Sequence, residues 1–221
     1  MRRREFLTLS TTSIGGVLVY SLDRQVSRLV AESHTSIRIP LRFFSKTEAL
    51  TVAAAASRIF PSDETGPGAR EAGVVVYIDR QLAGPWGRDR HRYTQEPFDD
   101  DAPPKFGYQG KATPQQIYRQ GLQNLNGFDL LDPAAQDEKL RQIEDTLFFS
   151  LLRQNTVEGM FCDPMHGGNK DMIGWQLIGF PGPRMSNYDD IDKHPGEAFR
   201  PKPASLAQVT GANPRPSEDE K

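Results

Sequence analysis

Residues 132–152 read DPAAQDEKLRQIEDTLFFSLL, and this stretch decides the fold class. Asp132 followed by Pro133 is typical of a helix start, because the carboxylate caps free N–H groups and proline fits the first helical position. Apolar residues then recur at helical spacing through Leu140 and Ile143. The helix continues or kinks into the most apolar stripe of the chain, formed by Leu147, Phe148, Leu151 and Leu152. The stretch therefore predicts a helical core.

Two further helices are predicted upstream from their capping residues. Ser45 and Glu48 have the spacing of a capping box, and the helix that they begin ends before Pro61. A second helix is predicted to begin with Thr113 as its N-cap and Pro114 at its first position. The faces expected to point inward are Leu50, Ala53, Ala54 and Ser57 in the first helix, and Ile117, Gly121, Leu122 and Leu125 in the second, with Tyr118 at its edge.

Residues 71–82 fit two structures. Val74, Val75, Ile78 and Leu82 lie at helical spacing, whereas residues 74–78 alone also fit a buried strand. The length of the segment and its polar residues 79–81 favour the helix.

Two long segments show little periodicity. Residues 84–111 are rich in glycine, proline and aromatic residues, which predicts packing on the domain or on a partner. After Gly179 the chain is rich in proline, and no regular element is expected there. The predicted fold is mainly α: a small irregular helical domain over residues 40–180, with long loops and an extended Pro-rich arm over residues 181–221.

Composition excludes several classes of protein. The chain has 221 residues, 37% of them hydrophobic, and a net charge of -2. It is too polar for a protein with many membrane spans, and its charge gives no bulk attraction to nucleic acid. With Cys162 as the single cysteine, a disulfide framework within the chain, a four-cysteine zinc site, a cysteine-ligated iron–sulfur cluster and c-type haem are excluded.

The first 31 residues resemble a twin-arginine export signal. Arg3 and Arg4 are followed by Phe6 and Leu7, and then by a short apolar run over residues 14–20. That run is too short to span a bilayer comfortably. This export route moves folded proteins, often with a cofactor, although the chain has no cofactor motif. The chain therefore folds rapidly or travels with a protein that holds a cofactor.

The segment around residues 156–175 has two interpretations. Asp163, His166 and Asp171 are candidate metal ligands, but their spacing matches no standard site. The structural interpretation is favoured, with turn residues at Asp163, Pro164, Gly167, Gly168 and Asn169, and Asp171 as the cap of a short helix that bears Met172, Trp175 and Ile178. No catalytic, cofactor-binding or metal-binding residue is assigned.

The sequence EGMFCDPMHGGN at residues 158–169, followed by Trp175 and by IGFPG at residues 178–182, resembles one family. It is the gluconate 2-dehydrogenase subunit 3 family, the small subunit of periplasmic flavin-dependent sugar and sugar-acid dehydrogenases. The resemblance covers roughly residues 46–183. His166 and Phe180 stand where the family commonly has tyrosine.

The resemblance implies a non-catalytic subunit. Its relatives pair with a large FAD-carrying catalytic subunit of the glucose–methanol–choline oxidoreductase type, and a cytochrome c subunit often completes the complex. The small subunit is thought to export its partner, folded and loaded with flavin. A periplasmic complex associated with the inner membrane is expected, with FAD in the partner. The alternative is a stand-alone periplasmic enzyme that uses His166 with Asp163 or Asp171.

The two long irregular segments, which are rich in proline and aromatic residues, and the resemblance together predict where a partner is contacted. Partner contacts are predicted over residues 84–111 and 181–205, and at Cys162, Trp175, Phe180, Tyr188 and Phe199. A single cysteine in an exported protein indicates either a buried thiol or an intermolecular bridge. The resemblance favours a disulfide from Cys162 to the catalytic subunit.

Overall fold

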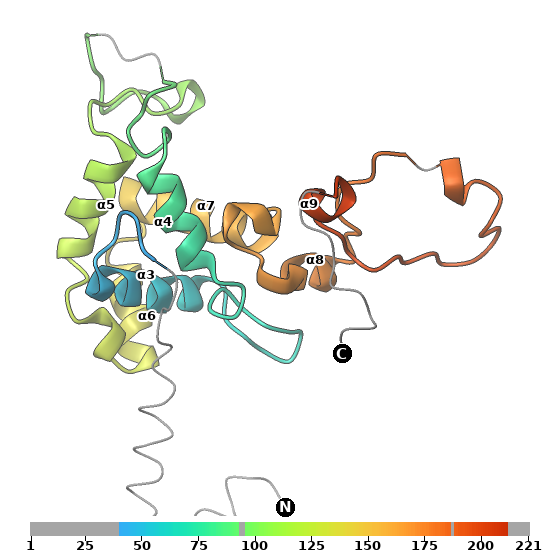
Figure 1. Ribbon diagram of the computed structural model, residues 1–221. Coiled ribbons are helices and arrows are strands. Elements are labelled where there is room, and N and C mark those ends of the chain that lie inside the picture. The colour runs from blue at the N-terminus through green and yellow to red at the C-terminus, as the bar shows by residue number, and fades with distance from the viewer. Residues whose placement is uncertain (1–39, 93–95, 187, 212–221) are drawn as a thin grey trace, which may run out of the picture. The chain divides into compact units, whose positions relative to one another are not determined.

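The computed structural model describes residues 40–92, 96–186 and 188–211 (Figure 1). Within these ranges the chain is helical and forms no β-strand, which confirms the mainly α prediction. Within the same ranges, no helix is both long and apolar enough to cross a membrane. The predicted export signal, with Arg3, Arg4, Phe6 and Leu7, lies outside the described residues.

Helix α7 is the centre of the fold. It packs against α3, α4, α5 and α8, and α3 also packs against α4 and α6 (Figure 1). The helices are α3 (Lys46–Ile59), α4 (Val74–Ala83), α5 (Pro114–Gln123), α6 (Pro133–Arg141), α7 (Leu147–Phe161), α8 (Ile173–Ile178) and α9 (Leu206–Val209). Single 3₁₀ turns lie at 104–106, 128–130, 164–166, 170–172 and 188–190.

Helix α3 begins at the predicted capping box. The Ser45 hydroxyl accepts a hydrogen bond from the Glu48 N–H, and the Glu48 carboxylate accepts one from the Ser45 N–H. The predicted inner face is mostly wrong, because only Ala54 of its four residues is buried. The residues buried in the structure are Ala49, Thr51, Val52, Ala54, Ala55 and Ala56. This arc is broad because α3 faces α4, α6 and α7 together, and an alanine-rich helix offers little contrast for periodicity to detect.

Residues 74–83 form a helix, as the length of the segment predicted. Its Asp79 carboxylate is 1% exposed and accepts three backbone hydrogen bonds, from the N–H groups of Arg42, Phe43 and Phe44 at 2.7, 3.0 and 2.8 Å. These bonds satisfy the buried charge and fix residues 42–44 against α4.

The contact between α5 and α7 contains the largest correction to the predicted core. Tyr118, expected at an edge, is fully buried, and its hydroxyl accepts a hydrogen bond from the Asn155 side-chain amide at 2.8 Å. Its ring lies edge-on to Phe148, with centroids 5.4 Å apart. Gly121 allows this packing, since a Cβ there would lie 2.1 Å from the Phe148 ring.

Residues 132–152 form two separate helices rather than one continuous or kinked helix. Helix α6 begins at its predicted cap, Asp132, and ends at Arg141. Helix α7 has its own cap, because the Thr146 hydroxyl accepts a hydrogen bond from the Phe149 N–H at 3.2 Å. Leu147 is therefore a first-turn residue and is 38% exposed, whereas Phe148 and Leu152 are buried.

The segment after Gly179 contains regular structure that the sequence did not predict. Ser205 and Gln208 form a capping box that begins α9. The chain between residues 181 and 205, here called the arm loop, leaves α8 and returns at α9 (Figure 1). The Ala204 N–H donates to the Pro181 carbonyl at 3.1 Å, which closes the loop at its base.

Candidate functional site

Asn169 organises the segment from Gly159 to Gly182, here called the α7–α8 junction. This side chain is fully buried. Its amide nitrogen donates to the Cys162 carbonyl at 2.8 Å, and its amide oxygen accepts from the Gly174 N–H at 2.8 Å. Its backbone N–H donates to the Gly159 carbonyl at 2.8 Å. Asn169 therefore ties the end of α7 to the start of α8.

The backbone of the junction reverses through left-handed residues. Gly167 has φ 104° and Asn169 has φ 46°, as expected for the predicted reversal. Asp171 and Met172 are also left-handed, with φ 55° and 58°. The predicted cap at Asp171 is wrong, because Met172 precedes α8 and the Asn169 oxygen binds the Gly174 N–H. The Asp171 side chain is instead 78% exposed.

Both oxygens of Asp163 are bound to backbone N–H groups. Oδ1 accepts from Met165 at 3.0 Å, which is the predicted turn, and Oδ2 accepts from Leu206 at 2.6 Å. The second bond joins the junction to the first residue of α9. Asp163 therefore links two segments that lie 43 residues apart in the sequence.

Trp175 is a core residue of the chain. It is 3% exposed, and its indole N–H donates to the Phe161 carbonyl at 2.7 Å. Phe180 packs edge-on against it, with centroids 5.2 Å apart, and remains 41% exposed. The indole predicted to contact a partner is thus enclosed by its own chain, whereas Phe180 keeps an accessible face.

The structure does not pair the His166 imidazole with the carboxylate of Asp163 or Asp171, the residues of the alternative stand-alone enzyme. His166 is exposed, and in the described part of the chain no hydrogen bond or ion pair joins its imidazole to Asp163 or Asp171. Asp163 is occupied by backbone groups, and Asp171 lies 4.0 Å from Lys170 Nζ. No group of three or more His, Cys, Asp or Glu residues within residues 40–92, 96–186 and 188–211 is placed to hold a metal ion.

Cys162 is a partly buried free thiol at the end of α7. Burial raises the pKa of this thiol to about 11, with the neighbouring carboxylate of Asp163 adding to the effect. Its sulfur lies 3.7 Å from the Gly159 carbonyl oxygen. The thiol is therefore protonated at neutral pH and reacts slowly as a nucleophile in the free chain.

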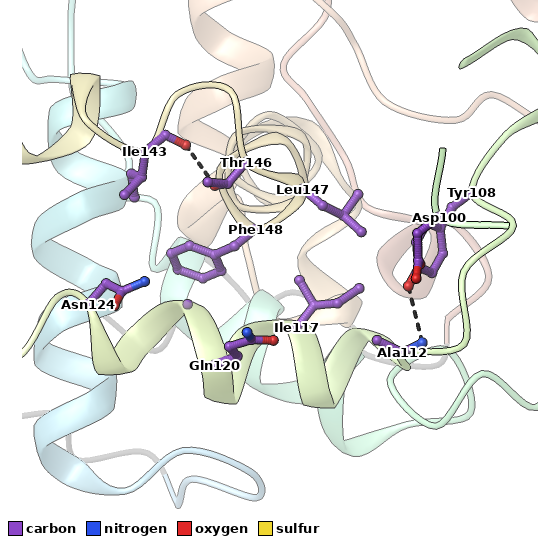
Figure 2. Close-up of a pocket in the computed structure, with 11 residues that line it drawn as sticks. Asp100, Tyr108, Ala112, Ile117, Gln120, Asn124, Ile143, Thr146, Leu147 and Phe148 are labelled. Atoms are coloured by element: carbon purple, nitrogen blue, oxygen red, sulfur yellow. Dashed lines mark hydrogen bonds between the residues drawn. The ribbon is translucent and has the colours of Figure 1, made fainter. Parts of the chain in front are cut away.

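A cavity of about 520 Å³ lies between α5, the start of α7 and the loop before α5 (Figure 2). Ile117, Leu147 and Phe148 supply its apolar lining, and Gln120 and Asn124 supply amides. Sequence reasoning did not predict this cavity. Its lining has a single ionisable carboxylate, Asp100, and no histidine, lysine or cysteine, so it presents no nucleophile with an adjacent base.

The loop over residues 84–111 bonds largely to its own chain. The Tyr108 hydroxyl accepts from the Ala112 N–H at 3.1 Å (Figure 2). The Arg92 guanidinium donates to the Gly110 carbonyl at 2.9 Å and to Asp89 at 2.6 Å. Phe106 of this loop is 62% exposed, so its ring is accessible for the predicted partner contact.

Comparison with known proteins identifies a family model that matches most of the chain. A model of the family described as gluconate 2-dehydrogenase subunit 3 matches residues 46–182, from the first residue of α3 through the α7–α8 junction. Searches of curated proteins and of solved structures found no match to the chain.

Proposed function

The chain belongs to the gluconate 2-dehydrogenase subunit 3 family, and on this premise we propose that it is a non-catalytic accessory subunit of a membrane-associated, FAD-dependent dehydrogenase of sugars, sugar alcohols or sugar acids. Family membership makes it the small subunit of a gluconate 2-dehydrogenase-type complex. The chain aids the folding, stability and export of a large catalytic subunit that carries the FAD. A cytochrome c subunit in the same complex accepts the electrons.

One observation supports the accessory role above all. Two polar side chains of the α7–α8 junction bind backbone groups: Asn169 bonds to Cys162 and Gly174, and Asp163 bonds to Met165 and to Leu206 of α9. General acid–base catalysis needs a group that is free to reach a substrate within a pocket. Asn169 and Asp163 are used to hold the fold, and in the described chain His166 and Asp171 are exposed rather than enclosed in a pocket, so we assign the chemistry and the flavin to the partner.

Export of the complex depends on the paired arginines in this proposal. The catalytic subunit folds around FAD, associates with this chain and crosses to the periplasm with it through the twin-arginine route. The small chain thereby supplies the export signal for both subunits, although it holds no cofactor itself.

Replacing both Arg3 and Arg4 by lysine is expected to reduce periplasmic dehydrogenase activity to near background, because lysine keeps the charge but loses the planar guanidinium. The measurement is dye-coupled activity in cell fractions, with gluconate and glucose as probe substrates. Arg2→Lys is the matched control and keeps wild-type activity. Normal periplasmic activity in the double variant contradicts the export role.

We also propose that Cys162 forms a disulfide with the catalytic subunit, which raises the effective concentration of one subunit near the other. In the complex isolated without reductant, Cys162 is expected to resist alkylation until a reductant is added. In the free chain its alkylation rate rises about tenfold per pH unit up to near pH 11, following the raised pKa of the thiol.

The two subunits are expected to migrate together on a non-reducing gel and separately after reduction. Cys162→Ser abolishes the joint band and serves as the control. Rapid alkylation of Cys162 in the unreduced complex excludes the bridge.

A further inference from the structure

Exposed apolar side chains gather in the C-terminal quarter of the described chain. Thirteen large apolar side chains are exposed among the described residues, and nine of them lie between Met165 and Val209. These nine are Met165, Ile178, Phe180, Met185, Tyr188, Ile191, Phe199, Leu206 and Val209. Such a concentration is typical of a surface that another molecule covers.

The arm loop holds a defined conformation. Asp163 binds the Leu206 N–H at its base, next to the bond between Ala204 and Pro181. Gly182 permits this closure, because it has φ 85° and a Cβ there would lie 2.0 Å from the Ala204 carbonyl oxygen.

An aromatic stack stiffens the loop away from its base. The Phe199 ring stacks on the His194 imidazole, with centroids 4.0 Å apart and planes 9° apart. The Arg184 guanidinium lies 5.6 Å from the centroid of the same ring and pairs with Asp190. The loop is therefore ordered by its own contacts. Less conformational entropy is then lost when the loop binds a partner.

The ordered arm loop exposes apolar side chains to solvent. Tyr188 is 83% exposed, Met185 75% and Ile191 56%. None of the three is used to build a core, whereas Gly182 at the base of the loop is buried. Aromatic and methionine side chains presented in this way are the residues enriched in protein–protein interfaces.

The charge of the arm loop favours a protein partner over anionic lipid or nucleic acid. Residues 181–205 carry four basic side chains (Arg184, Lys193, Arg200 and Lys202) and four acidic ones (Asp189, Asp190, Asp192 and Glu197). A balanced segment gains no net attraction to anionic lipid or nucleic acid, both of which select basic surfaces. The arm loop fits a folded protein surface with apolar hollows.

We propose that the arm loop is the element that docks on the large catalytic subunit, and that Asp163 is the positioning residue that latches the loop for docking. This inference rests on the proposed function, which supplies the partner. Residues Met185, Tyr188 and Ile191 contact that partner. Asp163 contributes indirectly, because its Oδ2 fixes the point at which the loop returns to the junction.

The test uses the full chain with an affinity tag, expressed with the flavoprotein catalytic subunit in the cells that make the complex. The readout, taken in reducing buffer so that no disulfide from Cys162 holds the subunits together, is the amount of flavoprotein retained on the tagged chain, identified by its bound flavin, over a dilution series that yields Kd. Tyr188→Ala is expected to weaken binding about tenfold or more, as truncation of a central interface aromatic does. Leu130→Ala is the matched control, because Leu130 is 77% exposed and lies outside the loop.

Asp163→Ala is expected to weaken binding by a similar factor and to speed hydrogen exchange over residues 182–204, with exchange in α3 and α4 unchanged. Asp163→Asn keeps an acceptor oxygen and restores part of the affinity. Asp171→Asn, which removes an exposed charge of the same junction with a residue type that tolerates φ 55°, has no effect on binding.

The outcomes separate the two proposals. Failure of the wild-type chain to retain the flavoprotein overturns the proposed function. Retention that is equal for wild type, Tyr188→Ala and Asp163→Ala overturns the docking role of the arm loop alone. Tyr188-dependent binding to phosphatidylglycerol vesicles, or Tyr188-dependent self-association, with unchanged flavoprotein binding also overturns it in favour of a lipid surface or a second copy.

Discussion

Asp79→Asn lowers the free energy of unfolding by about 3–5 kcal/mol, because hydrogen bonds to a buried charged group contribute about 1.5–3 kcal/mol each and are not fully additive. The carboxylate accepts from three backbone N–H groups at residues 42–44 and is 1% exposed. An asparagine supplies one acceptor oxygen and places an NH₂ group among donors. The single oxygen can serve either the Arg42 N–H, now bound to Oδ2, or the Phe43 and Phe44 N–H groups, now bound to Oδ1, so at least one of them loses its partner.

Urea unfolding followed by circular dichroism measures this effect. Asp145→Asn is the matched control, because Asp145 is exposed and forms no hydrogen bond or ion pair in the described structure. It should change stability by less than about 0.5 kcal/mol, as surface substitutions generally do. If Asp79→Asn behaves like this control, the three bonds do not hold residues 42–44 in solution.

Asn169→Ala is expected to cost about 3–4 kcal/mol, since it removes the partners of two buried backbone groups and adds a backbone penalty of about 1 kcal/mol. The groups left without partners are the Cys162 carbonyl and the Gly174 N–H. The backbone penalty arises because alanine must adopt φ 46°.

Asn169→Gly separates the two contributions. Glycine adopts the left-handed conformation freely but also lacks the amide, so it recovers only the backbone part of the loss. Denaturant unfolding of wild type, Asn169→Ala and Asn169→Gly, with hydrogen exchange at Gly174, measures the backbone contribution and the side-chain contribution to the free energy of unfolding. A glycine variant as stable as wild type contradicts the role of the side chain at the junction.

Local signals allowed the starts of α3, α5 and α6 to be predicted from the sequence. The pairs Ser45 with Glu48 and Thr113 with Gln116 lie three residues apart, and both form complete capping boxes. Asp132 likewise caps its own helix. An interaction confined to one turn depends on residues that can be read together, so these starts needed no knowledge of the fold.

Several features that sequence reasoning missed depend on distant partners, although the Thr146 cap of α7 and the Ser205–Gln208 capping box of α9 are local signals that were also missed. The burial of Tyr118 depends on Asn155, 37 residues later, and the role of Asp79 depends on backbone groups 35 to 37 residues earlier. Asn169 was predicted as a turn residue. In the structure its side chain, and not that of Asp171 as predicted, binds the start of α8. The closure of the arm loop by Asp163 could not be predicted for the same reason.

The alanine-rich face of α3 changes which substitutions the core tolerates. Ala49, Ala55 and Ala56 are at most 1% exposed, and alanine loses no rotamer freedom when it is buried. The helix thus joins the core at a low entropic cost, which suits a chain with only 37% hydrophobic residues. Its close approach to its neighbours leaves almost no side-chain volume to delete and no space to add any. Mutational damage along α3 therefore comes from larger side chains, the reverse of the pattern in cores built from leucine and phenylalanine.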